Sequence, residues 1–268
     1  MDMCKAARKN SRWIWRSLRQ AQRLGTKIGE ESVTDFFLLN LRKEATSKIK
    51  IKSFIKHDEA KNGSDWEWES EWWFTGPSDQ WLGMRIQAKV ISLKTDRYEY
   101  LHRSKQGTTP QVETLITAAM KDNKVPVYCL YSYWSTRKNL YKAIFSEHHP
   151  GLRAPDFGAS IVDALTIRRL SRTGKANHLS DLLPEMRPLH HLFCPGTTTK
   201  DDLPEVVIGY LNRFRFGDSQ NRRLSRQAPG YIYRLRELAN SQRIVDEAQF
   251  AQLFPDDRLR TVTIFEQQ

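Results

Sequence analysis

Two short stretches of sequence decide the predicted fold: Asn62-Gly63-Ser64-Asp65-Trp66-Glu67-Trp68 and Ile86-Gln87-Ala88-Lys89. The segment between them, residues 69–85, reads as a strand, a turn at Gly76-Pro77 and a second strand. A Gly/Pro turn between two strand-like runs is typical of a β-hairpin. We therefore expect the two stretches to lie side by side at one end of an antiparallel pair.

Alternation along the two strands places polar side chains on one face. Successive side chains of a strand point to opposite faces of the sheet. Asp65 and Glu67 therefore share a face of the first strand, and Gln87 and Lys89 share a face of the second. Folding the hairpin brings an acid, a carboxamide and an amine together, which suits a divalent-metal site for phosphate chemistry.

The pattern Asp65…Gln87-x-Lys89 resembles the PD-(D/E)XK nuclease superfamily, and within it the Mrr-like branch, where Gln replaces the second acid. The sequence is also similar to an uncharacterised bacterial family with Gly-[Ala/Ser]-Asp-Trp-Glu-Trp, Gln-Ala-Lys and a later Pro-x-Tyr. The resemblance covers residues 28–134. It implies an α/β fold with a restriction-endonuclease-like core, a mixed sheet in the order helix-strand-strand-strand-helix-strand. It also implies a metal-dependent DNA endonuclease, a hydrolase of restriction or anti-phage defence that uses Mg²⁺ or Mn²⁺.

The resemblance also implies roles for single residues. Asp65 would be the principal metal ligand, with the Ala88 carbonyl and the Gln87 side-chain oxygen as further ligands. Lys89 would orient the attacking water or stabilise the developing negative charge. Glu67 could supply a further carboxylate.

The first core helix of this superfamily often sends a glutamate toward the metal. Glu31 is our first candidate for that role and Glu30 the second. Acids in the first turn of a helix also complement the helix dipole. This role alone would explain the presence of either glutamate.

The order of expected elements agrees with this core. A helix begins at Glu30, a half-buried strand covers residues 48–55, a helix covers 111–120, and a buried strand covers 125–131. A strand–helix–strand crossover implies a parallel pair. Further elements are expected as helices over 11–25 and 161–170, a loop around Leu189 to Cys194, and a closing strand over 259–265.

We divide the chain of 268 residues into a basic amphipathic N-terminal helix (1–27), a nuclease-like core (28–135) and a mixed helical C-terminal elaboration (136–268). The N-terminal helix would pack on its own domain or lie on DNA or a membrane surface. The elaboration is expected to contact nucleic acid. The sequence leaves open whether the protein forms a homodimer or binds a protein partner in a larger complex.

Charge and composition limit the kinds of partner that the protein could bind. Lys and Arg exceed Asp and Glu by 43 to 31, a net charge of +12, which favours a polyanion such as DNA. No apolar run approaches the ~20 residues of a spanning helix, so no membrane partner is expected. The N-terminus has no apolar segment of a secretory signal. Three scattered cysteines predict no disulfide framework and a cytoplasmic location.

Two further patterns are weaker. An arginine-rich segment, interleaved with aromatic residues such as Phe214 and Tyr231, suits phosphate contact and base stacking or a solvated helix face; its candidate nucleic-acid-binding residues are Arg213, Arg215, Arg222, Arg223 and Arg226. His178, His190, His191 and Cys194 are zinc-ligand types without paired zinc spacing, so ordinary loop histidines are favoured.

Two functions therefore stand as alternatives. One is the metal-dependent DNA endonuclease. The other is a catalytically inactive nuclease-like module that binds nucleic acid or serves assembly. Asp65, Gln87 and Lys89 gathered around a cleft would favour the enzyme, and burial of these side chains would favour the module.

Overall fold

The computed structural model describes residues 3–44, 49–55, 69–99, 101, 110–135, 137–174, 177–194, 202–217, 224–241, 252–254 and 258–268. Its helices are α1 (Met3–Leu24), α2 (Glu30–Glu44), α3 (Gln111–Lys121), α4 (Asn139–His148), α5 (Ala164–Arg172), α6 (Leu179–Leu182), α7 (Leu203–Arg213) and α8 (Gly230–Ser241), with 3-10 turns η1 (Ala154–Phe157) and η2 (Leu189–Phe193). Its strands are β1 (Ile49–Ile55), β2 (Glu69–Thr75), β3 (Trp81–Ser92), β4 (Arg97–Tyr98), β5 (Val125–Tyr131), β6 (Ala159–Asp163), β7 (Arg187–Pro188) and β8 (Leu259–Gln267). The protein is thus an α/β protein.

The predicted hairpin is present over its described part. β2 and β3 pair antiparallel, with Glu69 opposite Gln87 and Thr75 opposite Trp81. Gly83 lies opposite Trp73, and a Cβ at Gly83 would come within 2.7 Å of the indole ring. Only glycine therefore allows the two strands to approach each other under this tryptophan.

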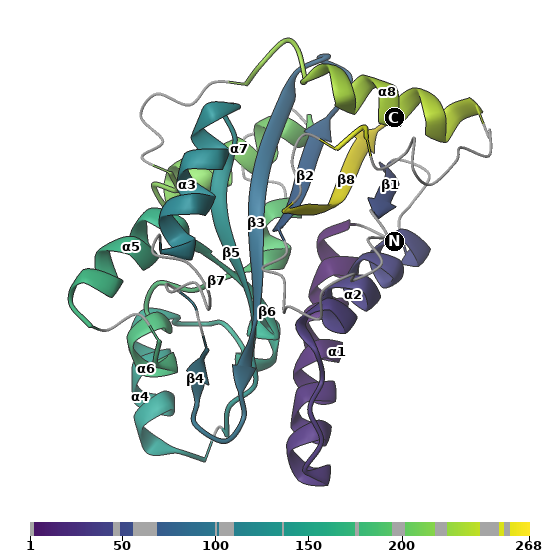
Figure 1. The fold of residues 1–268 in the computed structure, drawn as a ribbon. Helices are drawn as coiled ribbons and strands as arrows, with labels where there is room; N and C mark the ends of the chain where they lie inside the picture. Colours follow the sequence, from purple (N-terminus) through teal and green to yellow (C-terminus); the bar gives the residue numbers. More distant parts are fainter. Residues whose placement is uncertain are drawn as a thin grey trace.

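The sheet is mixed and open, in the order β1-β8-β2-β3-β5-β6-β7, with β4 paired to β3 (Figure 1). The expected parallel pair is confirmed, because β3 and β5 run parallel and are joined through α3. The closing strand is also confirmed as β8, but it lies between β1 and β2, antiparallel to the first and parallel to the second.

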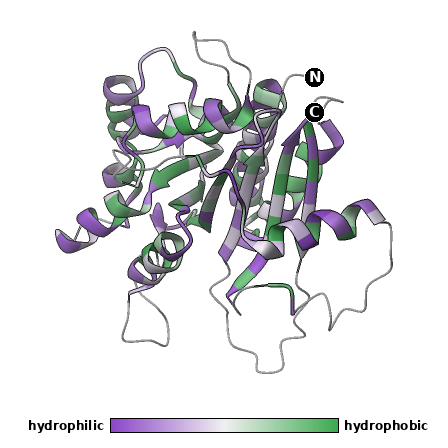
Figure 2. Ribbon diagram, turned by 90° about the horizontal axis from the view of Figure 1, so that it is seen from above, coloured by the Kyte–Doolittle hydropathy of each residue, from purple (hydrophilic) through white to green (hydrophobic). Residues whose placement is uncertain are grey.

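Hydrophobic side chains cover both faces of this sheet. One face carries Trp72, Met84 and Val127 and packs against α1, α2 and α7. The other face carries two separate hydrophobic clusters, one under α3 and α5 and one under α8. In Figure 2 the strands are largely hydrophobic and the outer helices are mixed. Polar side chains of β2 and β3 lie on this second face, since they alternate with the residues of the first.

α1 begins well before the predicted residue 11 and packs on its own chain. Its buried residues include the predicted Ile14, Leu18 and Ala21. It lies against η1, η2 and α2. A Cβ on Gly158, which follows η1, would fall 1.8 Å from the Ser11 carbonyl oxygen, so this contact is backbone against backbone.

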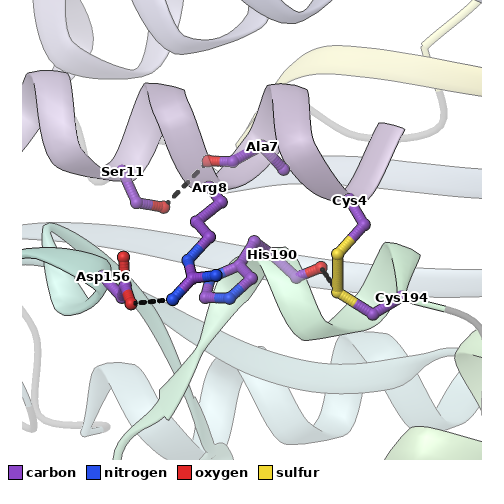
Figure 3. The surroundings of a disulfide bond; sticks show 7 residues. All are labelled: Cys4, Ala7, Arg8, Ser11, Asp156, His190 and Cys194. Atoms are coloured by element: carbon purple, nitrogen blue, oxygen red, sulfur yellow. Dashed lines mark hydrogen bonds and ion pairs between the residues drawn. A yellow bond between two sulfur atoms is a disulfide. The ribbon is translucent and has the colours of Figure 1, made fainter. Parts of the chain in front are cut away.

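Two sequence predictions are wrong. The helix expected over residues 161–170 is present only from Ala164, because Ala159–Asp163 is strand β6 and the Asp163 carboxylate caps α5 by accepting a hydrogen bond from the Thr166 amide. All five residues of β6 are buried, so the strand shows no alternation. Cys4 and Cys194 form a disulfide although 190 residues separate them, because α1 packs against η2 (Figure 3).

Among the described residues, no helix has the length and apolar character needed to cross a bilayer.

Candidate functional site

A polar row crosses the second face of the sheet between its two hydrophobic clusters. In the β2–β3 register, Glu69 lies opposite Gln87 and Glu71 lies opposite Arg85, so these four side chains share the face. All four are buried. Lys89 continues the row on β3, beyond the last described pair of the hairpin.

Gln87 lies at the centre of the predicted site and its side chain is fully buried. Neither its Nε2 nor its Oε1 atom has a hydrogen-bond partner among the described residues. A buried polar atom without a partner costs about 1–3 kcal/mol. A carboxamide left in this state is therefore suited to a ligand that supplies the missing partners.

Lys89 approaches the first turn of α2, where its neighbour is Glu30 and not Glu31, our first candidate. Its Nζ atom lies 4.0 Å from a carboxylate oxygen of Glu30, and its side chain is 12% exposed. Glu30, our second candidate for the helix glutamate, is thus the acid next to Lys89. The pair joins the amine of β3 to the helix that precedes the hairpin in the sequence.

Glu31, our first candidate, has a different partner. Its carboxylate lies 2.5 Å from Nη1 of Arg260 on β8 and is 48% exposed. In α2 the buried residues are Val33, Phe37, Leu38 and Leu41, which turns Glu31 toward β8 and solvent. Adjacent helix residues point about 100° apart, so Glu30 and Glu31 cannot both face Lys89.

The remaining hairpin candidates are Ala88, Asp65 and Glu67. The Ala88 side chain packs against the first-face core, and its Cα partner in β5 is Cys129. Asp65 and Glu67 lie outside the described residues, so the predicted approach of Asp65 to Lys89 stays a prediction. No group of three or more His, Cys, Asp or Glu suited to a metal occurs in the part of the chain that the structure describes.

A buried ionic cluster surrounds Glu71, and the sequence patterns did not predict it. Its carboxylate accepts hydrogen bonds from Arg85, Lys124, Trp73 and Tyr231. Burial, and then the neighbouring carboxylate, raise the pKa of the Tyr231 phenol far above its usual value, so this hydroxyl stays a donor. Part of the signal was present in the sequence, because Arg85 interrupts an otherwise apolar strand sequence, whereas Lys124 stands in the polar turn before β5.

Arg85 links this cluster to Glu69, the residue opposite Gln87. Its Nε donates to a Glu69 oxygen and its Nη1 donates to Glu71 over 3.3 Å. The carboxylates of Glu69 and Glu71 thus share one guanidinium, which holds these two β2 side chains of the polar row in place. The cluster therefore braces the strand pair from which Gln87 projects.

The part of the arginine-rich segment around Arg226 lies at the far end of β3. Ser225 bridges Trp81, the first residue of β3, and Arg226 follows it. Lys89 is eight residues further along the strand, roughly 26 Å at about 3.3 Å per residue. Arg213, Arg215 and Arg226 are exposed. Arg222 and Arg223 lie outside the described residues.

The aromatic side chains of this segment are already engaged. Phe216 is buried, Tyr231 donates to Glu71, and the guanidinium of Arg187 lies 4.8 Å from the Phe214 ring centre. Tyr233 packs edge-on against Trp81. Base stacking by these four rings would need each of them to leave its partner.

The zinc-type residues do not gather around a common point among the described residues. His190 is buried in η2, and Cys194 is bonded to Cys4. Burial, and then the adjacent His191, lower the pKa of His190 to about 3, so its ring is neutral at physiological pH.

A family model described as a family of unknown function (DUF6615) matches residues 3–268. No curated protein and no solved structure matches the chain.

Proposed function

The chain belongs to the DUF6615 family, and we propose that it is a metal-dependent phosphodiester hydrolase that cleaves DNA, in restriction or anti-phage defence. The proposal rests on the residues of β3 and on the order of the elements around them. The alternative is a nuclease-like module that binds nucleic acid or serves assembly without cleaving.

The observation that carries the proposal is the state of Gln87. It is the first residue of the Gln-x-Lys pattern, it is buried, and neither polar atom of its amide has a described partner. The residue opposite it, Glu69, is four positions from Asp65 in the sequence. An amide that needs a partner thus lies next to the strand on which the sequence places the principal acid.

The element order adds support. The series α2, β1, β2, β3, α3, β5, with β2 antiparallel and β5 parallel to β3, agrees with the core that the motif implies. Strand β8 is an addition between β1 and β2. A restriction-endonuclease-like core is therefore part of the proposal.

The donor set fits a hard divalent cation. Gln87 offers an amide oxygen, Ala88 a carbonyl oxygen and Glu30 a carboxylate, and Asp65 would add the principal one. Mg²⁺ and Mn²⁺ prefer oxygen ligands, and Mg²⁺ commonly uses only one or two carboxylates. A bound ion would neutralise charge on the phosphate and assist the leaving oxygen.

Lys89 would act on the substrate and not on the ion. A protonated amine cannot coordinate a cation, but it can donate hydrogen bonds to a phosphate oxygen or to the attacking water. Its contact with Glu30 at 4.0 Å keeps the ammonium at this end of β3. Gln87 is neutral, so this site binds metal more weakly than one with a second acid.

The inactive alternative also has a specific observation in its favour. Gln87 is fully buried, and Lys89 is 12% exposed beside an acid. A ligand can reach Gln87 only if this end of the sheet opens or if the partner comes from residues outside the described range. Metal binding and cleavage decide between the two functions.

The test is cleavage of supercoiled plasmid with Mg²⁺ or Mn²⁺, together with calorimetric titration of the metal. We expect Asp65→Ala to lose metal binding and cleavage. Lys89→Ala should keep metal binding and cleave about 10²-fold or more slowly, since it removes one group that stabilises developing charge. Gln87→Glu should bind the metal more tightly because it adds an acid.

Lys142→Ala is the matched control, because Lys142 is an exposed lysine on α4. It should cleave like the wild type after the same purification. Equal cleavage by Asp65→Ala, Lys89→Ala and the wild type would show that the assigned site is wrong. A wild-type protein that neither binds metal nor cleaves would support the inactive module.

A further inference from the structure

The outer side of α1 carries an uninterrupted row of cations. Every charged residue of this helix is a lysine or an arginine, and the sequence from Met3 to Gly29 contains no acid. The cations follow one another at spacings of three or four residues: Lys5, Arg8 or Lys9, Arg12, Arg16, Arg19 and Arg23. That spacing places them on one face, opposite the buried face of Ile14 and Leu18.

The two halves of this row differ in their partners. Near the N-terminus, Arg8 and Arg12 both bind the buried Asp156, and Lys9 pairs with Glu44. Arg16, Arg19 and Arg23 are exposed, and no described acidic side chain lies within ion-pair distance of them. The C-terminal half of α1 is therefore a surface of positive charge that no acid of the described residues compensates.

This half of α1 lies beside the end of β3, four residues beyond Lys89. Gln22, between Arg19 and Arg23, donates through Nε2 to the Leu93 carbonyl oxygen over 3.1 Å, just past the end of β3. Residues 25–29, which include the exposed Lys27, connect α1 to Glu30 at the start of α2. The exposed Lys94 follows Leu93. The cations thus lie next to the end of β3 that carries Lys89, whereas Arg226 lies near the other end.

We propose that the α1 ridge, defined as Arg16, Arg19, Arg23 and Lys27 with Lys94, binds the phosphate backbone of double-stranded DNA beside the Gln87–Lys89 site. This assignment of a partner rests on the proposed function. Phosphate contacts by arginine and lysine fix the position of a duplex without reading its sequence. The ridge positions the substrate, and the residues of β3 act on it.

An anionic membrane is the less suitable partner. A helix that binds a membrane surface inserts an apolar face into the headgroup region. The apolar face of α1 is already buried, since Ile14, Trp15, Leu18 and Ala21 are all in the core. Apart from Leu24 at the end of the helix, which is 67% exposed, only the polar side of α1 remains for a partner.

A single strand also fits less well than a duplex. Proteins that bind single strands combine positive charge with aromatic rings on which the bases stack. Between its arginines the ridge offers Ser17 and Gln20 and no aromatic ring. Duplex DNA carries one charge per about 1.7 Å of axis, and a row of cations without rings matches that dense charge.

The test measures binding in EDTA, so that cleavage does not contribute. A fluorescent 30-base-pair duplex is titrated with the full chain at several salt concentrations. Arg16→Gln/Arg19→Gln/Arg23→Gln should lower the slope of log K against log salt by about 2.7, at about 0.9 per phosphate contact, and weaken binding at least tenfold at low salt. The charge-preserving triple change of the same residues to Lys should restore most of the binding.

The matched control removes the same charge elsewhere. Lys121→Gln/Arg172→Gln/Arg234→Gln changes three exposed cations on α3, α5 and α8, which cover the other face of the sheet, and should keep the wild-type slope. Equal loss in both triple variants would overturn the proposal, because net charge alone would then explain binding. Wild-type binding by the ridge variant, or loss caused instead by Arg213→Gln/Arg215→Gln/Arg226→Gln, would overturn it as well.

Two further measurements separate this inference from the proposed function. Tight binding of the wild type to anionic vesicles, without binding to the duplex, would overturn the choice of DNA. Ridge-dependent binding in EDTA without cleavage in Mg²⁺ would refute the nuclease and keep the ridge. Metal-dependent cleavage that the ridge variant retains in full would keep the nuclease and refute the ridge.

Discussion

His190 shows how burial decides the protonation of a single side chain. It lies in η2 beneath α1, with its ring centre 4.4 Å from that of His191 and close to Arg8 (Figure 3). Its Nδ1 atom has no hydrogen-bond partner among the described residues. Burial and the neighbouring histidine lower the pKa of His190 to about 3, so in mild acid the folded protein holds a neutral ring whereas the unfolded chain is protonated there.

This difference predicts a loss of stability in mild acid. Between pH 6.5 and about 3 the unfolded chain binds a proton at His190 that the folded protein does not, so stability falls as the pH falls. From pH 7 to pH 5 one such histidine costs about 2 kcal/mol. His190→Leu should reduce the fall in unfolding free energy by that amount in urea titrations at pH 7, 6 and 5. An unchanged pH dependence would show that His190 is protonated in the folded state.

At the scale of elements, one carboxylate joins several parts of the fold. Glu71 on β2 accepts from Trp73 on the same strand, Arg85 on β3, Lys124 before β5 and Tyr231 on α8. Lys124 also lies over the rings of Trp73 and Tyr231, 5.7 Å from each centre. α8 is thus attached to the sheet by a polar contact as well as by the cluster of Ile232 and Leu235.

Removing this carboxylate should be strongly destabilising. Glu71→Leu leaves the buried Arg85 and Lys124 without their shared anion, and breaking a buried ion pair costs about 3–5 kcal/mol. Glu185→Leu is the matched control, because its pair with Arg169 is exposed and worth at most about 1 kcal/mol. Denaturant unfolding of both variants tests the difference. Equal costs would contradict a central role for Glu71.

Across the whole molecule, local sequence patterns predicted the helices, the strands and their nearest pairings better than they predicted contacts between distant segments. The hairpin, α3 with its inward Val112 and Leu115, and parallel β5 follow from periodicity and from the rule for crossovers. The place of β8 between β1 and β2 could not follow, because alternation shows a strand but not its neighbours. Of the site, Gln87 and Lys89 share the predicted face, but the choice between Glu30 and Glu31 depended on how α2 turns against β8.

The disulfide gives the last prediction at this scale. Cys4 near the start of α1 and Cys194 after η2 enclose most of the chain, with a separation of 190 residues. A cross-link over so long a loop restricts the unfolded chain, and such bonds typically contribute about 2–4 kcal/mol. Cys194→Ser, or reduction by a dithiol, should lower the unfolding free energy by this amount.

The third cysteine supplies the control for that experiment. Cys129 is buried in β5, and burial raises the pKa of its thiol to about 12, so it should not exchange with the disulfide in the folded protein. Cys129→Ser should therefore leave unaltered the difference between oxidised and reduced protein. If both forms of the wild type unfold at the same denaturant concentration, α1 is held by its contacts with η1, η2 and α2 alone. The ridge of arginines would then keep its place beside β3 in a reducing environment as well.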